Sequence, residues 1–264
     1  MAHSDFWIVH PFNAVFDLML LFFALLLTAA SLLLRKKEEK TRETVLIVTC
    51  LVTTVFFFWY KYMLSLDREF NVLTADMGGF NWWGELPLHM CNINMLLIPV
   101  AVLRKSRPMQ SFCFFLGPLG ALMALVMPSN GFEGYSLFLP RMLGFYITHC
   151  MVIVEGLALA AFGLFRPRFR DLPRAALAAM AIAFGAFLVS MLLRLTGLHP
   201  KANYFFSVET EGNPILELFH RWLPFPFLYL IPCNLILLPY MLLVTALFTL
   251  ADKRKGKKKL AASK

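Results

Sequence analysis

Long apolar stretches, separated by short polar connections, repeat along almost the whole chain. A helix needs about 20 mostly apolar residues to cross the hydrocarbon core of a bilayer. The pattern therefore predicts an all-α, polytopic membrane protein with seven transmembrane helices in a single domain over residues 1–264. The seven predicted spans cover residues 13–34, 43–63, 87–103, 110–128, 141–163, 175–195 and 225–250.

The connections between these stretches alternate in charge. Residues 35–42, 104–108, 166–174 and 253–264 are basic and hold 19 of the 25 lysines and arginines. The other connections, 64–86, 129–140 and 196–224, are longer and rich in Gly, Asn and aromatic residues. Because basic loops stay on the cytoplasmic side, the N-terminus is predicted outside and the C-terminus in the cytoplasm. The five tryptophans fall at the predicted outer interface, at positions 7, 59, 82, 83 and 222.

Composition agrees with a membrane protein. Hydrophobic residues make up 59% of the chain and charged residues 16%, against roughly 25% charged in typical globular domains. The net charge of +9 lies mostly in the basic connections. It sets orientation and, in the C-terminal tail, favours anionic lipid headgroups as partners. No nucleic-acid-binding module is recognisable, so nucleic acid is not an expected partner. The predicted location is the plasma membrane.

The five cysteines show neither a C-x-x-C motif nor a Cys/His cluster at zinc spacing. We therefore expect no metal and no other cofactor. We also expect no cleavable signal peptide, because residues 1–12 lack Lys and Arg and the following apolar run is too long.

Polar side chains gather at the start of the third stretch, after Trp82 and Trp83. Polar groups within a span need a partner and often mark a functional site. Cys91 lies about one turn inside the third stretch and His149 about two turns inside the fifth, within roughly 5–15 Å of the outer surface. That depth predicts a pocket for a lipid headgroup or another amphiphile. The polar set at the third stretch is Glu85, His89, Cys91, Asn92 and Asn94.

A helix beginning at Pro87, a residue favoured in the first turn, would divide this set between two faces. Glu85, His89 and Asn92 would share one face, with Cys91 on another. A thiol needs a nearby base to become a nucleophile. His89 would point away from Cys91, so His149, at similar depth on another helix, is the expected base.

Each of these residues also has a purely structural interpretation. A cysteine in a membrane helix commonly serves as a small packing residue. Asn92 and Asn94 would then join neighbouring helices by hydrogen bonds. Asp17 and Arg194 would form an ion pair near the surface.

Three segments resemble a known family: Leu86-Pro87-Leu88-His89-Met90-Cys91-Asn92, Thr148-His149, and Ala202-Asn203-Tyr204-Phe205-Phe206. They are similar to the YwaF-type integral membrane proteins, a bacterial group related to a vertebrate transmembrane acyltransferase that remodels ether phospholipids. The resemblance covers nearly the whole chain. It implies that Cys91 is the nucleophile and His149 its general base. Asn203 and Tyr204 become supporting residues, and the host is expected to be bacterial.

Two functions remain open from the sequence. One is a lipid acyltransferase or acyl hydrolase near the outer leaflet, with phospholipid or lysolipid as substrate and His89, Asn92 or Asn94 as oxyanion donors. The other is a non-catalytic carrier, receptor or lipid-binding protein. In that case Asp17, His89, His149 and Glu155 would form a binding or proton-relay group.

Overall fold

The computed structural model describes residues 7–75, 78–129 and 131–262, with side chains as far as residue 254. The chain is 71% helical with almost no strand, which confirms the predicted all-α class. The helices are α1 (Ala14–Leu34), α2 (Glu39–Ser65), α3 (Arg68–Leu73), α4 (Ile93–Leu103), α5 (Arg107–Val126), α6 (Pro140–Ala161), α7 (Leu172–Leu195), α8 (Pro214–Trp222) and α9 (Asn234–Ala262). Two short strands, β1 (Ile8–Val9) and β2 (Tyr135–Ser136), pair antiparallel.

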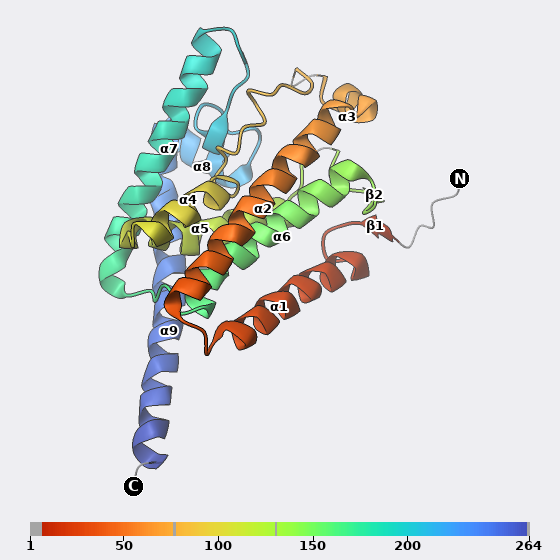
Figure 1. The fold of residues 1–264 in the computed structure, drawn as a ribbon. Helices are drawn as coiled ribbons and strands as arrows, with labels where there is room; N and C mark the ends of the chain where they lie inside the picture. Colours follow the sequence, from red (N-terminus) through yellow and green to blue (C-terminus); the bar gives the residue numbers. More distant parts are fainter. Residues whose placement is uncertain (1–6, 76–77, 130, 263–264) are drawn as a thin grey trace.

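In the described part of the chain, six helices are long and apolar enough to cross a membrane. They are α1, α2, α5, α6, α7 and the last helix with the 3₁₀ turn that leads into it. Figure 1 shows these long helices with α4 as a short piece among them. A polytopic membrane protein is therefore confirmed, while the count of seven spans stays a prediction.

The third predicted span is helical only over α4, which has 11 residues. The predicted start at Pro87 is wrong, because the helix begins at Ile93, whose N–H donates to the carbonyl of His89. Proline disfavours the helical region for the residue before it, and Leu86 accepts a tight hydrogen bond from Leu88 instead. Residues 84–92 thus reach α4 as a series of turns.

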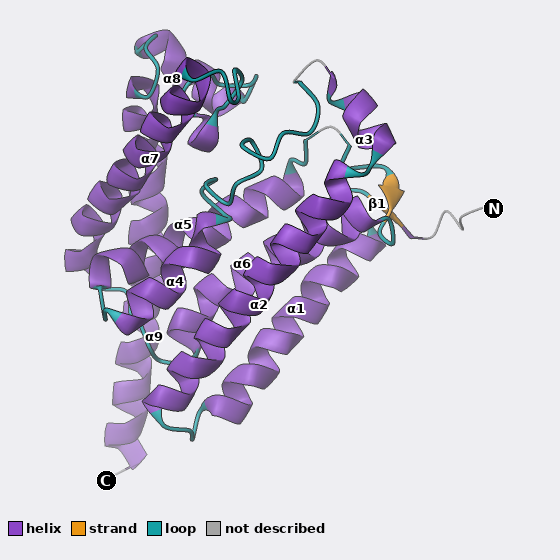
Figure 2. Cartoon of the chain, turned by 45° about the horizontal axis from the view of Figure 1, so that its top comes forward, coloured by secondary structure: helices purple, strands orange, loops and turns teal. Residues whose placement is uncertain are grey.

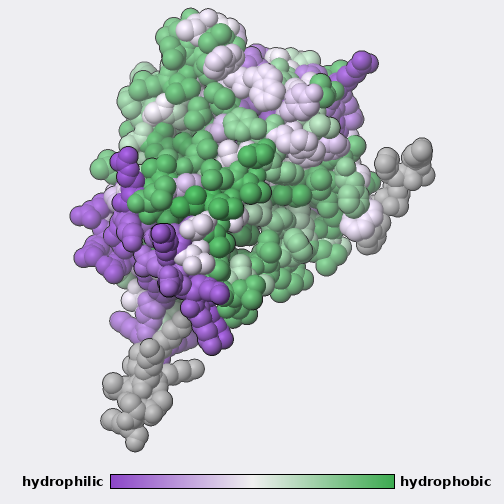
Figure 3. Space-filling model, viewed as in Figure 1, coloured by the Kyte–Doolittle hydropathy of each residue, from purple (hydrophilic) through white to green (hydrophobic). Residues whose placement is uncertain are grey.

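Contacts between the connections define two ends of the bundle. At the basic end, Lys105 pairs with Glu39 and Arg166 with Asp252. Figure 3 shows this end as a hydrophilic patch, with a broad hydrophobic belt beside it. Side chains of the tail beyond residue 254, where anionic lipid contacts were expected, lie outside those described.

The opposite end gathers the long connections. Here β1 pairs with β2, and Arg141 forms an ion pair with Asp67 at 2.9 Å. Tyr204 lies in the long connection 196–224 and donates to the carbonyl of Trp83, so residues 81–83 lie at this end. Residues 104–106 lie at the basic end. The chain between them therefore traverses the bundle with an interrupted helix.

Close packing of α6 against its neighbours organises the interior. Figure 2 shows α1, α2 and α6 running side by side. Gly144 of α6 lies against Tyr60 of α2, where an added Cβ would come within 2.1 Å of the ring. At Gly156 of α6 an added Cβ would come within 2.6 Å of Pro118 of α5. Small residues at such contacts let membrane helices approach closely, and this packing fixes α6, which carries His149.

Candidate active site

An ion pair fastens the irregular segment 84–92 to α2. Glu85 accepts a short hydrogen bond from the Lys61 ammonium group, which also lies 4.6 Å from the centre of the Tyr60 ring. The two charged side chains are only 11% and 23% exposed, Lys61 being the more buried. Glu85 therefore has a structural partner. The predicted helical face shared by Glu85, His89 and Asn92 does not form, because these residues lie in turns.

Cys91 and His149 meet across the bundle. The Cys91 sulfur lies 3.6 Å from Nε2 of His149, which projects from α6. Both residues are buried, with 8% and 7% of their surfaces exposed. The distance is within hydrogen-bonding range for sulfur, so the thiol and the imidazole form a contacting pair.

A second hydrogen bond defines the protonation of the imidazole. Nδ1 of His149 lies 2.7 Å from the carbonyl oxygen of Phe145, one turn earlier on α6. A carbonyl oxygen only accepts, so Nδ1 carries the hydrogen. In the neutral ring Nε2 then presents its lone pair, and it faces the Cys91 thiol. His149 is thus arranged to accept a proton from Cys91.

The surroundings of the pair are apolar. Cys91 packs in a buried cluster with Ala121 of α5 and Val152 of α6. The Phe145 ring lies 4.3 Å from the imidazole, centre to centre. Such a site excludes water, which strengthens electrostatic interactions within it. Among the described residues, no group of three or more His, Cys, Asp or Glu could hold a metal ion.

The two asparagines near Cys91 do not join helices as the structural interpretation expected. The Asn94 amide donates to the carbonyls of Met90 and Cys91, at 3.0 and 3.3 Å. It is fully buried against Gly117 of α5, where an added Cβ would lie 2.3 Å from its nitrogen. Asn92 is buried too, and its side-chain oxygen has no partner. Both therefore belong to the turn that carries Cys91.

His89, within the segment 84–92, packs against the loop 196–227. Its ring is 5.2 Å from that of Tyr204 and 6.1 Å from that of Phe206. His89 thus contacts the loop, and Cys91 takes its hydrogen-bond partner from α6.

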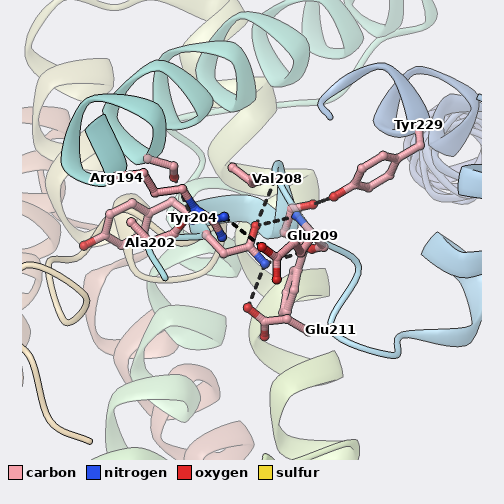
Figure 4. Close-up of polar contacts among 10 residues, drawn as sticks. Arg194, Ala202, Tyr204, Val208, Glu209, Glu211 and Tyr229 are labelled. Carbon is pink, nitrogen blue, oxygen red and sulfur yellow. Dashed lines mark hydrogen bonds and ion pairs between the residues drawn. The ribbon is translucent and has the colours of Figure 1, made fainter. Parts of the chain in front are cut away.

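Polar contacts shape the loop that contains Asn203 and Tyr204; Figure 4 shows Tyr204, Val208 and Glu209 of this loop with Arg194 of α7. The Asn203 side-chain oxygen accepts from the N–H groups of Val208 and Glu209, and its nitrogen donates to the Glu209 carbonyl and the Glu211 carboxylate. All hydrogen-bonding positions of that amide are used within the loop. Asn203 thus holds the loop together, and Tyr204 lies against His89 in the segment leading to Cys91.

Two contacts were not foreseen from the sequence. No partner was predicted for Lys61, although a lysine inside an apolar stretch signals a buried partner. Arg194 was expected to pair with Asp17, which is wrong. Arg194 pairs with Glu209 at 2.7 Å and donates to the carbonyl of Ala202, whereas Asp17 is exposed in the first turn of α1.

A model of the TMEM164 family matches residues 6–245, which is most of the chain. The chain belongs to the TMEM164 family. No curated protein and no solved structure matches it. The part shared with the TMEM164 family includes Cys91, His149 and the loop around Asn203. The YwaF-type resemblance and its link to an acyltransferase stay predictions.

Proposed function

We propose that this protein is a membrane-embedded lipid acyltransferase or acyl hydrolase with Cys91 as nucleophile and His149 as general base. The observation that carries the proposal is the 3.6 Å contact between the Cys91 sulfur and Nε2 of His149. The bond from Nδ1 to the Phe145 carbonyl supports it, because it leaves Nε2 free to accept the thiol proton.

The reaction begins when Nε2 takes the thiol proton and the Cys91 sulfur attacks the carbonyl carbon of a lipid ester. The carbon–sulfur bond forms while the carbonyl electrons move to oxygen. When the intermediate collapses, the ester carbon–oxygen bond breaks and the leaving alkoxide takes the proton from His149. The product is an acyl-thioester on Cys91 and a lysolipid.

The second half reverses these steps with a different alcohol. An acceptor hydroxyl gives its proton to His149 and attacks the thioester carbon, and the sulfur leaves and recovers the proton. Water in place of the alcohol would make the protein a hydrolase. Burial of both residues favours transfer to a lipid acceptor, because a membrane-embedded apolar site limits access of water.

The remaining expectations follow from the same proposal. Substrate and acceptor are membrane phospholipids and lysolipids that enter laterally near the outer leaflet. The host membrane is a plasma membrane, with a bacterial host inferred from the resemblance. The basic tail contacts anionic headgroups on the opposite side.

The test is mass spectrometry of the intact purified protein after incubation with phosphatidylcholine vesicles. Wild type should gain one acyl mass that hydroxylamine removes, as expected for a thioester. Cys91→Ser should lose the hydroxylamine-sensitive adduct, and His149→Ala should form it at least about 100-fold more slowly.

Cys150→Ser is the matched control for this experiment. Cys150 is next to His149 on α6 and is as buried as Cys91, yet it makes no contact with the imidazole nitrogen in the described structure. This variant should keep the adduct. An adduct that persists in Cys91→Ser, or none in wild type, would contradict the proposed function.

A further inference from the structure

The turn that carries Cys91 presents a run of backbone N–H groups that no carbonyl oxygen accepts. Within the described residues, the N–H groups of Met90, Cys91 and Asn92 donate to no carbonyl oxygen. They precede α4, whose first bonded N–H belongs to Ile93. Buried N–H groups are nearly always paired in folded proteins. Here the N–H groups of Cys91 and Asn92 are directed at the Cys91 sulfur, so both donors lie beside the atom that would attack a carbonyl carbon.

Asn94 fixes the direction of two of these donors. Its amide nitrogen binds the carbonyls of Met90 and Cys91. In a trans peptide group the C=O and N–H bonds point in opposite directions. Because the Asn94 amide binds these two carbonyls, the N–H groups of Cys91 and Asn92 point away from Asn94. Gly117 makes this possible, because any Cβ there would collide with the Asn94 amide.

Asn92 provides an independent observation. It occupies the N-cap position of α4, but its side chain makes no capping bond. Asn13 and Asn213, at the N-caps of α1 and α8, both accept N–H groups from the helix that follows. Asn92 is 8% exposed and its side-chain oxygen is unpartnered. This buried oxygen is an acceptor, so a hydroxyl or another donor of a bound molecule would satisfy it.

We propose that the N–H groups of Cys91 and Asn92 form the oxyanion hole of this site, with Asn94 as the residue that positions them. The inference rests on the proposed function. When the Cys91 sulfur bonds to the ester carbon, the negative oxygen on that carbon lies within reach of the N–H of Cys91 itself. The next N–H, of Asn92, provides the second donor, and the ligand class is a carboxylic ester or thioester.

The experiment compares two reactions of Cys91 in detergent-solubilised full-length protein. Acylation by p-nitrophenyl octanoate develops a negative oxygen, whereas alkylation by iodoacetamide displaces iodide at a saturated carbon and develops none. Removing the positioning residue should slow only the first. We expect Asn94→Ala to acylate at least about tenfold more slowly and to alkylate within about threefold of wild type.

Asn234→Ala is the matched control. Asn234 begins α9, donates to the carbonyl of Ile231 at 2.9 Å and also has an unpartnered side-chain oxygen. It reproduces the local arrangement of Asn94 at the start of a different helix, and both reactions should keep their wild-type rates. Gly117→Ala perturbs the Asn94 amide from α5 and should reproduce the selective loss of acylation.

The outcomes separate this inference from the function it rests on. Equal loss of acylation and alkylation in Asn94→Ala would show that Asn94 merely maintains the turn, which overturns the inference. Unchanged acylation in Asn94→Ala overturns it as well. A wild-type protein that is alkylated at Cys91 but acylated by no ester would overturn the proposed function together with the oxyanion hole.

Discussion

Lys61 of α2 holds Glu85 in a largely buried ion pair, and this contact joins a regular membrane helix to the irregular segment that leads to Cys91. The ammonium group also lies over the rings of Tyr60 and Phe57. Irregular backbone at membrane depth is tolerated only where protein surrounds it. The pair thus stabilises a local structure that the apolar sequence alone would not adopt.

Lys61→Met should therefore destabilise the protein, although lysine and methionine are similar in size. Glu85 would be left with a partly buried, unpaired charge. We expect a loss of about 2 kcal/mol, below the usual cost of breaking a fully buried pair because Glu85 is partly exposed. Thermal unfolding in detergent measures the loss. The double variant with Glu85→Gln should regain part of it, and an equally unstable double variant would argue against the pair.

The contact of Gly144 with Tyr60 leads to a second prediction. An added Cβ would overlap the ring, so Gly144→Ala should separate α2 from α6 and cost about 2–3 kcal/mol through overpacking. Gly185 on α7 has nothing within 4 Å of its position. Gly185→Ala is therefore the control and should stabilise its helix by up to about 1 kcal/mol. Similar unfolding temperatures for the two variants would contradict the close approach.

His199 links stability to pH at the end formed by the long connections. Burial lowers the pKa of its imidazole below the ordinary value; Glu85 opposes this shift and Arg194 adds to it. The folded protein therefore binds this proton less readily than the unfolded chain. The contribution of neutral His199 to the free energy of unfolding is therefore fully present above about pH 6.5. It is lost as the pH falls through the lowered pKa.

The comparison that isolates this effect is between wild type and His199→Gln. The unfolding temperature of wild type should exceed that of the variant by more at about pH 7.5 than at about pH 5. A difference that stays constant over this range would show that His199 does not titrate during unfolding.

Much of the architecture could be predicted from hydrophobic stretches and loop charges. The predicted span 141–163 and the observed α6, for example, differ by two residues at most. The third span failed because Pro87 was treated as a helix start. Glu85 bonds to Lys61 and Tyr204 bonds to Trp83, and these tertiary contacts outweigh local helix preference over residues 84–92.

The sequence predicted which residues form the candidate site, but it did not predict their arrangement. The similar depth of Cys91 and His149 in their apolar stretches predicted that the two residues are partners. The structure places them in contact. The helical wheel used to exclude His89 assumed a helix that is absent there. The bond to Phe145 that directs the imidazole depends on the rotamer of His149, which no sequence pattern reports.

Glu155 is a buried acid that accepts a hydrogen bond from the Thr53 hydroxyl and also interacts with the Cys50 thiol. Its other oxygen has no partner. An amide would keep an acceptor for Thr53 without introducing a buried charge, so Glu155→Gln should unfold at the same or a higher temperature. Glu155→Ala leaves a cavity beside Thr53 and should lose about 2 kcal/mol. Strong destabilisation by Glu155→Gln would indicate that the carboxyl group itself is required.

Orientation in the membrane decides which leaflet supplies the substrate. Cys91 follows a segment fastened to the end formed by the long connections, so it lies nearer to that end than to the basic one. The distribution of lysine and arginine predicts this end outside. Ser129 and Lys37 are exposed at the two ends. On intact cells, a membrane-impermeant maleimide should label Ser129→Cys and should reach Lys37→Cys only after permeabilisation. The reverse pattern would place the Cys91–His149 pair toward the cytoplasmic leaflet, and lipids of that leaflet would then be its substrates.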